Sequence, residues 1–196
     1  MKRRFDEAMI RAVSERADLL PLLAEVFRSH GYEGATLALI GEATGLGKGS
    51  LYHFFPGGKA QMAAEVLAEI DRWFEVNIFA QLRKSDDPAR AIAGMIKAVD
   101  SYFRSGHRVC LVGVIALGAS RDTFATQVQD YFVRWNDSLA WVLRRSGLSA
   151  NVARRRSADA LLTIQGALVL ARALDDSTVF GQAMADMKAR LLAKSD

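Results

Sequence analysis

The sequence predicts an all-α fold, with a small N-terminal domain of three helices followed by a larger helical domain. Proline occurs only three times in 196 residues, and 51% of the residues are hydrophobic. Apolar residues recur at helical spacing along most of the chain, and no segment alternates as a strand would. Few helix breakers and a sustained helical periodicity favour a small number of long helices.

Composition limits the partners of the protein. The net charge of +4 and the pI near 9.4 permit a polyanionic partner without requiring one. A single cysteine, Cys110, excludes an internal disulfide, and no Cys/His spacing predicts a metal or cofactor site. Charged residues interrupt the N-terminus, and the apolar run at 109–119 is too short to cross a bilayer. We expect a cytoplasmic protein without a membrane partner.

The N-terminal domain is assigned to residues 1–60 and contains eight Lys and Arg against seven Asp and Glu. Its first helix ends at Gly31, a typical C-cap residue, and tolerates Pro21 only in its first turn. Thr36 is the expected N-cap of the second helix, which Gly45 ends. The three helices are placed at 16–30, 36–44 and 47–54. Residues 5–14 fit a short helix and a frayed arm equally well.

The C-terminal domain is assigned to residues 61–196. A long helix from Lys59 to Arg83 begins in one domain and ends in the other, so the boundary lies within a helix. Pro88 starts the next helix, and glycines or an Asp-Asp-Ser cap separate the later ones. These helices are expected at 88–105, 109–119, 122–146, 149–174 and 177–194.

Residues 36–55 carry the features of a helix-turn-helix. This unit needs a small residue where its two helices touch, a glycine in the turn and apolar anchors in both helices. Gly41 and Gly45 supply the first two. The apolar anchors are Ile40, Leu46, Leu51 and Phe55. By spacing alone, DNA binding and a plain three-helix bundle are equally well supported.

The outward face of the third helix favours DNA binding. If Leu51 points inward, the exposed residues are Lys48, Gly49, Ser50, Tyr52 and His53. In a helix-turn-helix this face contacts base edges and phosphates, and a glycine permits close backbone approach.

Together these residues resemble the signature of the TetR family of transcriptional regulators. The resemblance is carried by Gly31-Tyr32-Glu33, Thr36, Ile40, the run from Gly45 to Pro56, and Lys59. It covers about residues 16–70 closely, and the Pro56-Gly57-Gly58-Lys59 segment is similar to the LmrA and YxaF subgroup. Gly41 and Gly47 depart from the pattern, which usually has alanine and a serine or threonine there.

The resemblance implies contacts to double-stranded DNA. Thr36 would meet a phosphate, Lys48 a guanine edge or a phosphate, and Ser50 and His53 bases or backbone. Tyr52 and Lys59 would clamp phosphates, and Gly49 would allow close approach. The basic run Lys2-Arg3-Arg4 is more simply a solvated terminus than an arm that enters the minor groove.

The resemblance also implies a homodimer, since two recognition helices one DNA turn apart contact a palindromic operator. In this family the last two helices of each subunit form the interface. The expected dimer residues are Leu161, Ile164, Leu168, Phe180, Met184 and Met187. An internal core would use part of the same apolar surface.

Helical repressors of this family hold effectors between their middle helices, so a small apolar or amphipathic effector is expected there. Candidate pocket residues are Trp73, Met95, Tyr102, Phe103, Cys110, Phe132 and Trp135. Most aromatic residues at helical spacing are simply core. Cys110 fits a buried structural residue better than a redox sensor, because only Arg108 could activate it.

The predicted function is therefore a ligand-responsive transcriptional regulator, most simply a repressor released from its operator by an effector. An enzyme is poorly supported, because no hydrolase, phosphate-loop, zinc or paired-carboxylate motif is present. The alternative that stays open is a helical dimeric interaction module without sequence-specific DNA binding.

Overall fold

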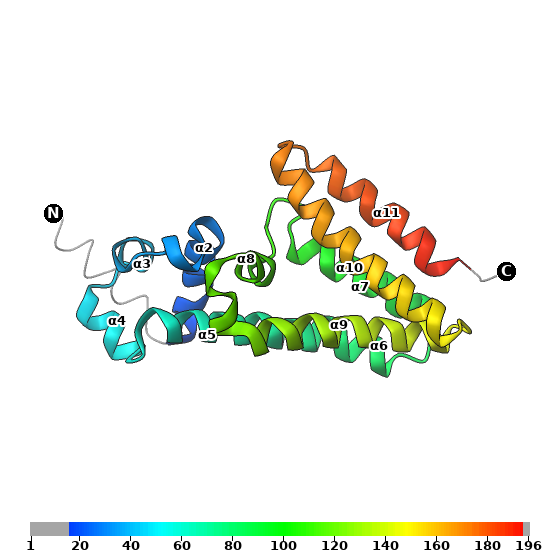
Figure 1. The fold of residues 1–196 in the computed structure, drawn as a ribbon, viewed down its shortest axis with the longest axis horizontal. Coiled ribbons are helices and arrows are strands. Elements are labelled where there is room, and N and C mark those ends of the chain that lie inside the picture. Colours follow the sequence, from blue (N-terminus) through cyan, green and yellow to red (C-terminus); the bar gives the residue numbers. More distant parts are fainter. Residues whose placement is uncertain (1–15, 194–196) are drawn as a thin grey trace. The chain divides into compact units, whose positions relative to one another are not determined.

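Figure 1 shows the computed structural model, which describes residues 16–193. These residues form helices linked by short turns, and no strand occurs among them, which confirms the all-α prediction. The chain divides into two compact units, which we describe separately. The first runs to Ile70 and includes Val114–Gln127, and the second contains Asp71–Gly113 and the residues from Val128 onward. The Lys2-Arg3-Arg4 run and residues 5–14 lie outside the described residues.

Among the described residues, four helices form the main part of the first unit, to which the inserted segment Val114–Gln127 adds. They are α2 (Arg16–Gly34), α3 (Leu37–Thr44), α4 (Lys48–Phe54) and the larger part of α5 (Gly58–Phe74). Their apolar faces meet in a core that excludes solvent. The fully buried side chains of this core include Leu19, Leu23, Phe27, Ile40, Leu51 and Phe55.

Helix α2 agrees with the sequence-based prediction at Gly31, where the regular helix ends, and differs from it at Pro21, near the start. Gly31 adopts φ 66° and ψ 178°, so the regular helix stops there and one further turn follows to Gly34. Pro21 lies inside α2 rather than in its first turn. Its ring leaves the carbonyl of Ala17 without the usual amide donor. Pro21 is exposed, so water can bind that carbonyl.

The second unit contains the end of α5 and the later helices. Its elements are the π-helical η1 (Glu75–Phe79), α6 (Ala80–Lys84), α7 (Pro88–Tyr102), most of α9 (Ala125–Arg145), α10 (Ala150–Ala173) and α11 (Thr178–Leu192). Helices α10 and α11 pack side by side, and α7 also contacts α11 (Figure 1). Within residues 16–193, no helix is long and apolar enough to cross a membrane.

The predicted starts of α7, α10 and α11 are correct to within one residue. Asp87 caps α7 by accepting the Arg90 amide at 3.0 Å, with Pro88 in the first turn. Ser149 caps α10 through the Val152 amide at 3.4 Å. Before α11, the Asp176 carboxylate accepts both the amide and the hydroxyl of Thr178. The hydroxyl bond comes first among the causes that lower the pKa of Asp176.

Two segments differ from the regular helices expected. The helix predicted from Lys59 to Arg83 contains the π-helical turn η1 between α5 and α6. Around this turn Arg134 of α9 pairs with Asp71 and Glu75, and Arg83 pairs with Glu75. The apolar run at 109–119 forms the shorter α8 (Leu111–Leu117), and the 3₁₀ helix η2 (Ala119–Phe124) precedes α9.

Candidate nucleic-acid interface

The turn between α3 and α4 has the geometry of a helix-turn-helix. The Thr36 hydroxyl accepts the Leu39 amide at 3.2 Å and so caps α3, as the sequence predicts. Gly45 ends α3 in the left-handed region at φ 71°. The buried Thr44 hydroxyl donates to the Ile40 carbonyl at 2.7 Å and accepts from the Leu46 amide at 3.4 Å. These bonds fix the direction in which the chain enters α4.

Gly41 lies where α3 meets the turn. A Cβ atom at Gly41 would sit 3.0 Å from the Leu46 carbonyl oxygen. The turn backbone therefore approaches α3 more closely than a larger side chain would comfortably permit. This contact gives a local reason for glycine at a position where the family pattern usually has alanine.

Helix α4 turns one face inward and one outward. Leu51 is 1% exposed and Phe55, just after the helix, is fully buried. The opposite face consists of exposed residues, namely Lys48, Gly49, Ser50, Tyr52 and His53. Added atoms at Gly47 or Gly49 would meet nothing within 4 Å. The five outward residues predicted from the sequence thus form one open face, which we call the α4 face.

Lys59 lies at the junction between the end of α2 and the start of α5. Its ammonium donates to the carbonyls of Tyr32, at 2.9 Å, and Glu33, at 3.3 Å, and lies 4.6 Å from the centre of the Tyr32 ring. These contacts bind the start of α5 to the end of α2. These two bonds leave one of the three N–H donors of the ammonium available, so Lys59 positions the helices and its phosphate contact stays a prediction.

Further polar contacts hold α2 and α5 around the α4 face. Arg16 pairs with Glu65 of α5 and lies 5.0 Å from the centre of the Phe55 ring. Gln61 accepts the Gly57 amide at 2.7 Å at the start of α5. Hydrogen bonding to its own backbone amide is the main cause that lowers the pKa of Glu33, and a hydrogen bond with Ser120 of η2 adds to it. These contacts link α2, α5 and η2 within the unit that carries α4.

The predicted effector residues lie in the second unit, mostly within one aromatic cluster. Trp73 and Tyr102 have ring centres 4.6 Å apart, and Tyr102 also stacks edge-on with Phe103 at 5.0 Å. Met95, Phe103, Cys110 and Trp135 are buried, whereas Trp73, Tyr102 and Phe132 are half-buried. The burial of Cys110 agrees with the structural reading of that residue.

One residue at the centre of this cluster, Tyr131, was missed from the sequence. Phe74 and Tyr131 are fully or almost fully buried and contact each other at 5.0 Å between ring centres. The Trp135 indole nitrogen has no hydrogen-bond partner among residues 16–193, whereas the Tyr131 hydroxyl interacts with the Cys110 thiol. Burial raises the pKa of Tyr131 well above its ordinary value, so its hydroxyl stays protonated. The helical spacing of Tyr131 resembles that of other core residues, so no sequence signal distinguishes it.

The predicted dimer residues mostly lie in the core of their own chain. Ile164, Leu168, Phe180, Met184 and Met187 are at most 4% exposed, and Leu161 is half-buried. They join α10 to α11 and to the helices beneath them. The open side of these two helices instead carries Leu162, Gly166, Val169, Leu170, Gly181, Ala185 and Ala189, which we call the α10–α11 face.

A helix-turn-helix with an open recognition helix, joined to a larger helical unit, defines a class of DNA-binding regulators. Residues 19–66 match the family described as bacterial regulatory proteins, tetR family. Residues 88–186 match the family described as transcriptional regulator LmrA/YxaF-like, C-terminal domain. The chain belongs to the TetR family of transcriptional regulators, in its LmrA/YxaF-like group. This family consists of regulators, not enzymes.

A sequence relative and two solved structures support this family assignment. The chain is 28% identical over 167 residues to the HTH-type transcriptional regulator LmrA of Bacillus subtilis, covering 83% of this chain and 89% of LmrA. A TetR family regulator from Agrobacterium tumefaciens has the same fold, with a TM-score of 0.76, 24% identity and coverage of 91% and 97%. CifR, a TetR family regulator whose cysteine mutant was solved with double-strand operator DNA, matches with a TM-score of 0.74 and 22% identity, covering 92% of this chain and 97% of CifR.

Proposed function

We propose that this regulator binds a palindromic operator as a homodimer and that a small effector releases it. The observation that carries the proposal is the α4 face. It presents one cation, two hydroxyls and an imidazole around a glycine, all exposed on a short helix that Leu51 and Phe55 anchor. These groups suit phosphates and major-groove base edges. The CifR structure supports the same use of this fold.

The α10–α11 face supports dimerisation. Leu162 is 71% exposed and Val169 is 60% exposed, although both are large apolar residues. Atoms added at Gly166 or Gly181 would meet nothing within 4 Å, so a second backbone can approach closely. Large apolar side chains left exposed beside glycines that permit close approach favour an interface. The occupant we propose is the same face of a second copy.

The aromatic cluster supports the effector part of the proposal. The Trp135 N–H is a buried donor without a partner among the described residues. A buried donor without an acceptor costs free energy, and a ligand that supplies an oxygen acceptor recovers it. The effector we propose is therefore mainly apolar, with at least one acceptor. It would release DNA by favouring a dimer whose recognition helices no longer fit the operator.

Selection from a randomised duplex library tests the DNA-binding proposal. We expect a palindrome bound by an even number of subunits at physiological salt. With the selected duplex, Lys48→Ala should lower affinity and reduce the slope of log affinity against log salt by about one unit, because one phosphate contact is lost.

Lys97→Ala is the matched control, since Lys97 is an exposed lysine of α7 in the other unit. It should leave both the affinity and the slope unchanged. A folded dimer that enriches no sequence, even after any bound ligand is removed, would instead favour the interaction module.

A further inference from the structure

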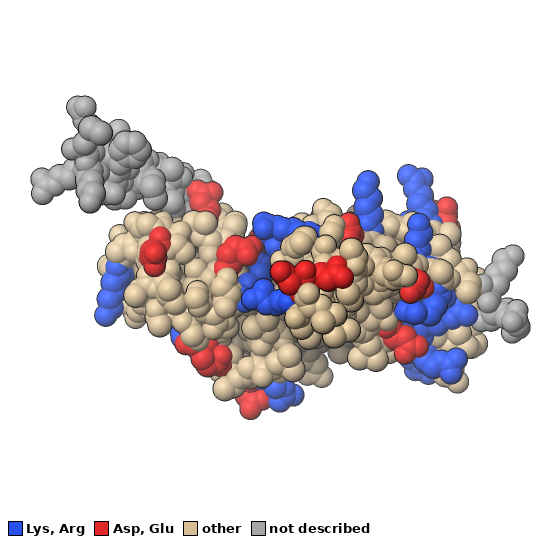
Figure 2. Space-filling model, turned by 90° about the horizontal axis from the view of Figure 1, so that it is seen from above, with Lys and Arg blue, Asp and Glu red and all other residues tan. Residues whose placement is uncertain are grey.

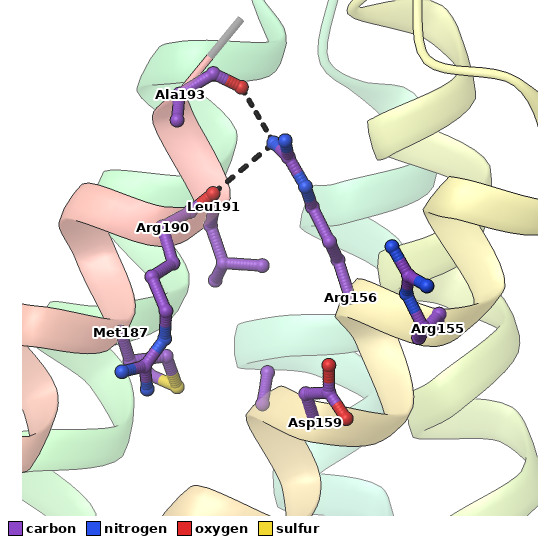
Figure 3. A pocket seen from close by; sticks show the side chains of 8 residues that line it. Arg155, Arg156, Asp159, Met187, Arg190, Leu191 and Ala193 are labelled. Atoms are coloured by element: carbon purple, nitrogen blue, oxygen red, sulfur yellow. Dashed lines mark hydrogen bonds between the residues drawn. The ribbon is translucent and has the colours of Figure 1, made fainter. Parts of the chain in front are cut away.

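A cavity of about 300 Å³ lies between α10 and the end of α11, away from the aromatic cluster. Figure 3 shows Arg155, Arg156 and Asp159 reaching it from α10, and Arg190 from α11. Ala160, Met187, Leu191 and Ala193 complete the lining. We call this cavity the arginine pocket.

Positive charge dominates the arginine pocket. Three guanidinium groups face one carboxylate, and none of these four side chains has an ion-pair partner among residues 16–193. On the surface seen in Figure 2, Lys and Arg side chains also gather over the C-terminal helices. An anion in the pocket would relieve the repulsion between these cations.

The arginines are partly oriented before any ligand binds. Arg156 donates to the backbone carbonyls of Arg190, at 3.1 Å, and Ala193, at 2.5 Å, as the dashed lines in Figure 3 show. Arg190 donates to the Thr163 hydroxyl at 3.3 Å. These acceptors are neutral, so they hold the guanidinium groups without cancelling their charge. Arginine is well suited to such a site, because its planar fork binds carboxylate or phosphate through two parallel bonds.

The floor of the pocket is apolar. Met187 is 1% exposed and Leu191 is 3% exposed, and Ala160 lies beside them. A ligand with only a charged group would leave these apolar side chains in contact with water. The pocket therefore suits a molecule with an anionic head toward the arginines and a short apolar tail on the floor.

We propose that the arginine pocket binds a small amphipathic anion, with a carboxylate or phosphate head, at a site separate from the proposed effector cluster. Such a ligand would bridge α10 and α11, the two helices that carry the α10–α11 face. The proposal stands independently of DNA binding, since it concerns only residues of the second unit.

Calorimetric titration of the full chain with hexyl phosphate, hexanoate and hexanol tests this site. We expect both anions to bind with a Kd below about 1 mM and more weakly at high salt, whereas hexanol binds much less tightly. A preference for hexyl phosphate over hexanoate identifies a phosphate head, and the reverse identifies a carboxylate. Equal affinity for hexanol and the two anions would overturn the proposal.

Variants separate this pocket from unspecific attraction to a basic surface. Arg155→Gln with Arg190→Gln should weaken hexyl phosphate binding about tenfold, since two partly exposed charges are removed. Asp159→Asn should tighten it by about threefold, because the only carboxylate among the described residues that line the pocket is neutralised. Arg156 is kept, since it also binds the end of α11.

Arg154→Gln is the matched control, because Arg154 is an exposed arginine of the same helix that bonds only to Asn151 among the contacts described. It should leave hexyl phosphate binding unchanged. Equal losses in Arg154→Gln and in the double variant, or no binding by the folded wild-type chain, would refute a specific pocket.

Discussion

Single residues near the α4 face were predictable where their roles are local. Thr36 and Gly45 act through neighbours in the sequence, so a cap and a left-handed turn follow from the residue types. The role of Lys59 was not predictable in this way. Its acceptors, the carbonyls of Tyr32 and Glu33, lie 27 and 26 residues away in the chain. A motif therefore indicates which lysines are present but not which ammonium groups are already bound.

Glu33 should make the stability of the protein depend on pH. Its pKa is lowered in the folded state, chiefly by its own backbone amide and also by Ser120. Its stabilising contribution is therefore present above the ordinary glutamate pKa of about 4.3 and is lost as the pH falls through the lowered value. Glu33→Gln should reduce the free energy of unfolding at neutral pH, and the difference from wild type should shrink in acid.

Urea unfolding of both proteins at several pH values measures this effect. Glu42→Gln, at another exposed glutamate of the same unit, controls for the loss of one negative charge. A difference between Glu33→Gln and wild type that persists unchanged in acid would contradict the role given to the carboxylate.

Among the elements, helix starts and stops were predictable, and departures from α-helix were not. Proline, glycine and capping residues mark the ends of α3, α7 and α10 within a few neighbouring positions. The π-turn η1 instead coincides with ion pairs from Arg134, more than fifty residues away. Its apolar spacing continues that of α5, so periodicity alone predicted one regular helix.

The turn after α7 gives a prediction about one glycine. Gly106 has φ +94°, and a Cβ atom there would lie 2.7 Å from the Cβ of Phe180. Gly106→Ala should therefore destabilise the protein by about 1–3 kcal/mol, through backbone strain and overlap with α11. The shift in urea midpoint at constant slope measures it.

Gly94 is the matched glycine for comparison, since it lies within α7 and an added Cβ would meet nothing within 4 Å. Gly94→Ala should stabilise the protein by about 0.5–1 kcal/mol, because alanine favours a helix. Equal effects of the two substitutions would show that Gly106 is not constrained by Phe180.

At the scale of the whole molecule, the class of fold was predictable. Which apolar residues enter the internal core and which remain exposed was not. Periodicity identifies α10 and α11 as amphipathic, yet it cannot say which side meets its own chain. Phe180 and Met184 serve the internal core, and Leu162 and Val169 remain exposed. Nor does any sequence pattern predict that Val114–Gln127 belongs to the N-terminal unit.

The α10–α11 face predicts how the dimer can be broken. Leu162→Glu places a charge in the proposed interface and should shift the protein toward a monomer of unchanged helical content. Sedimentation equilibrium measures the subunit number, and circular dichroism measures the helical content. Val133→Glu is the control, because Val133 is also exposed, at 47%, but lies on α9. A dimer that tolerates Leu162→Glu as well as Val133→Glu would exclude this face.

The division of the chain also matters for anyone who builds hybrid regulators. Because the N-terminal unit includes Val114–Gln127, a single splice near residue 60 would transplant it without a segment that belongs to it. Tyr32 of α2, for example, packs edge-on against Phe124 of η2, with ring centres 5.2 Å apart. A hybrid that keeps this packing needs three junctions, within α5, α8 and α9, so that the transplanted half brings its own inserted segment.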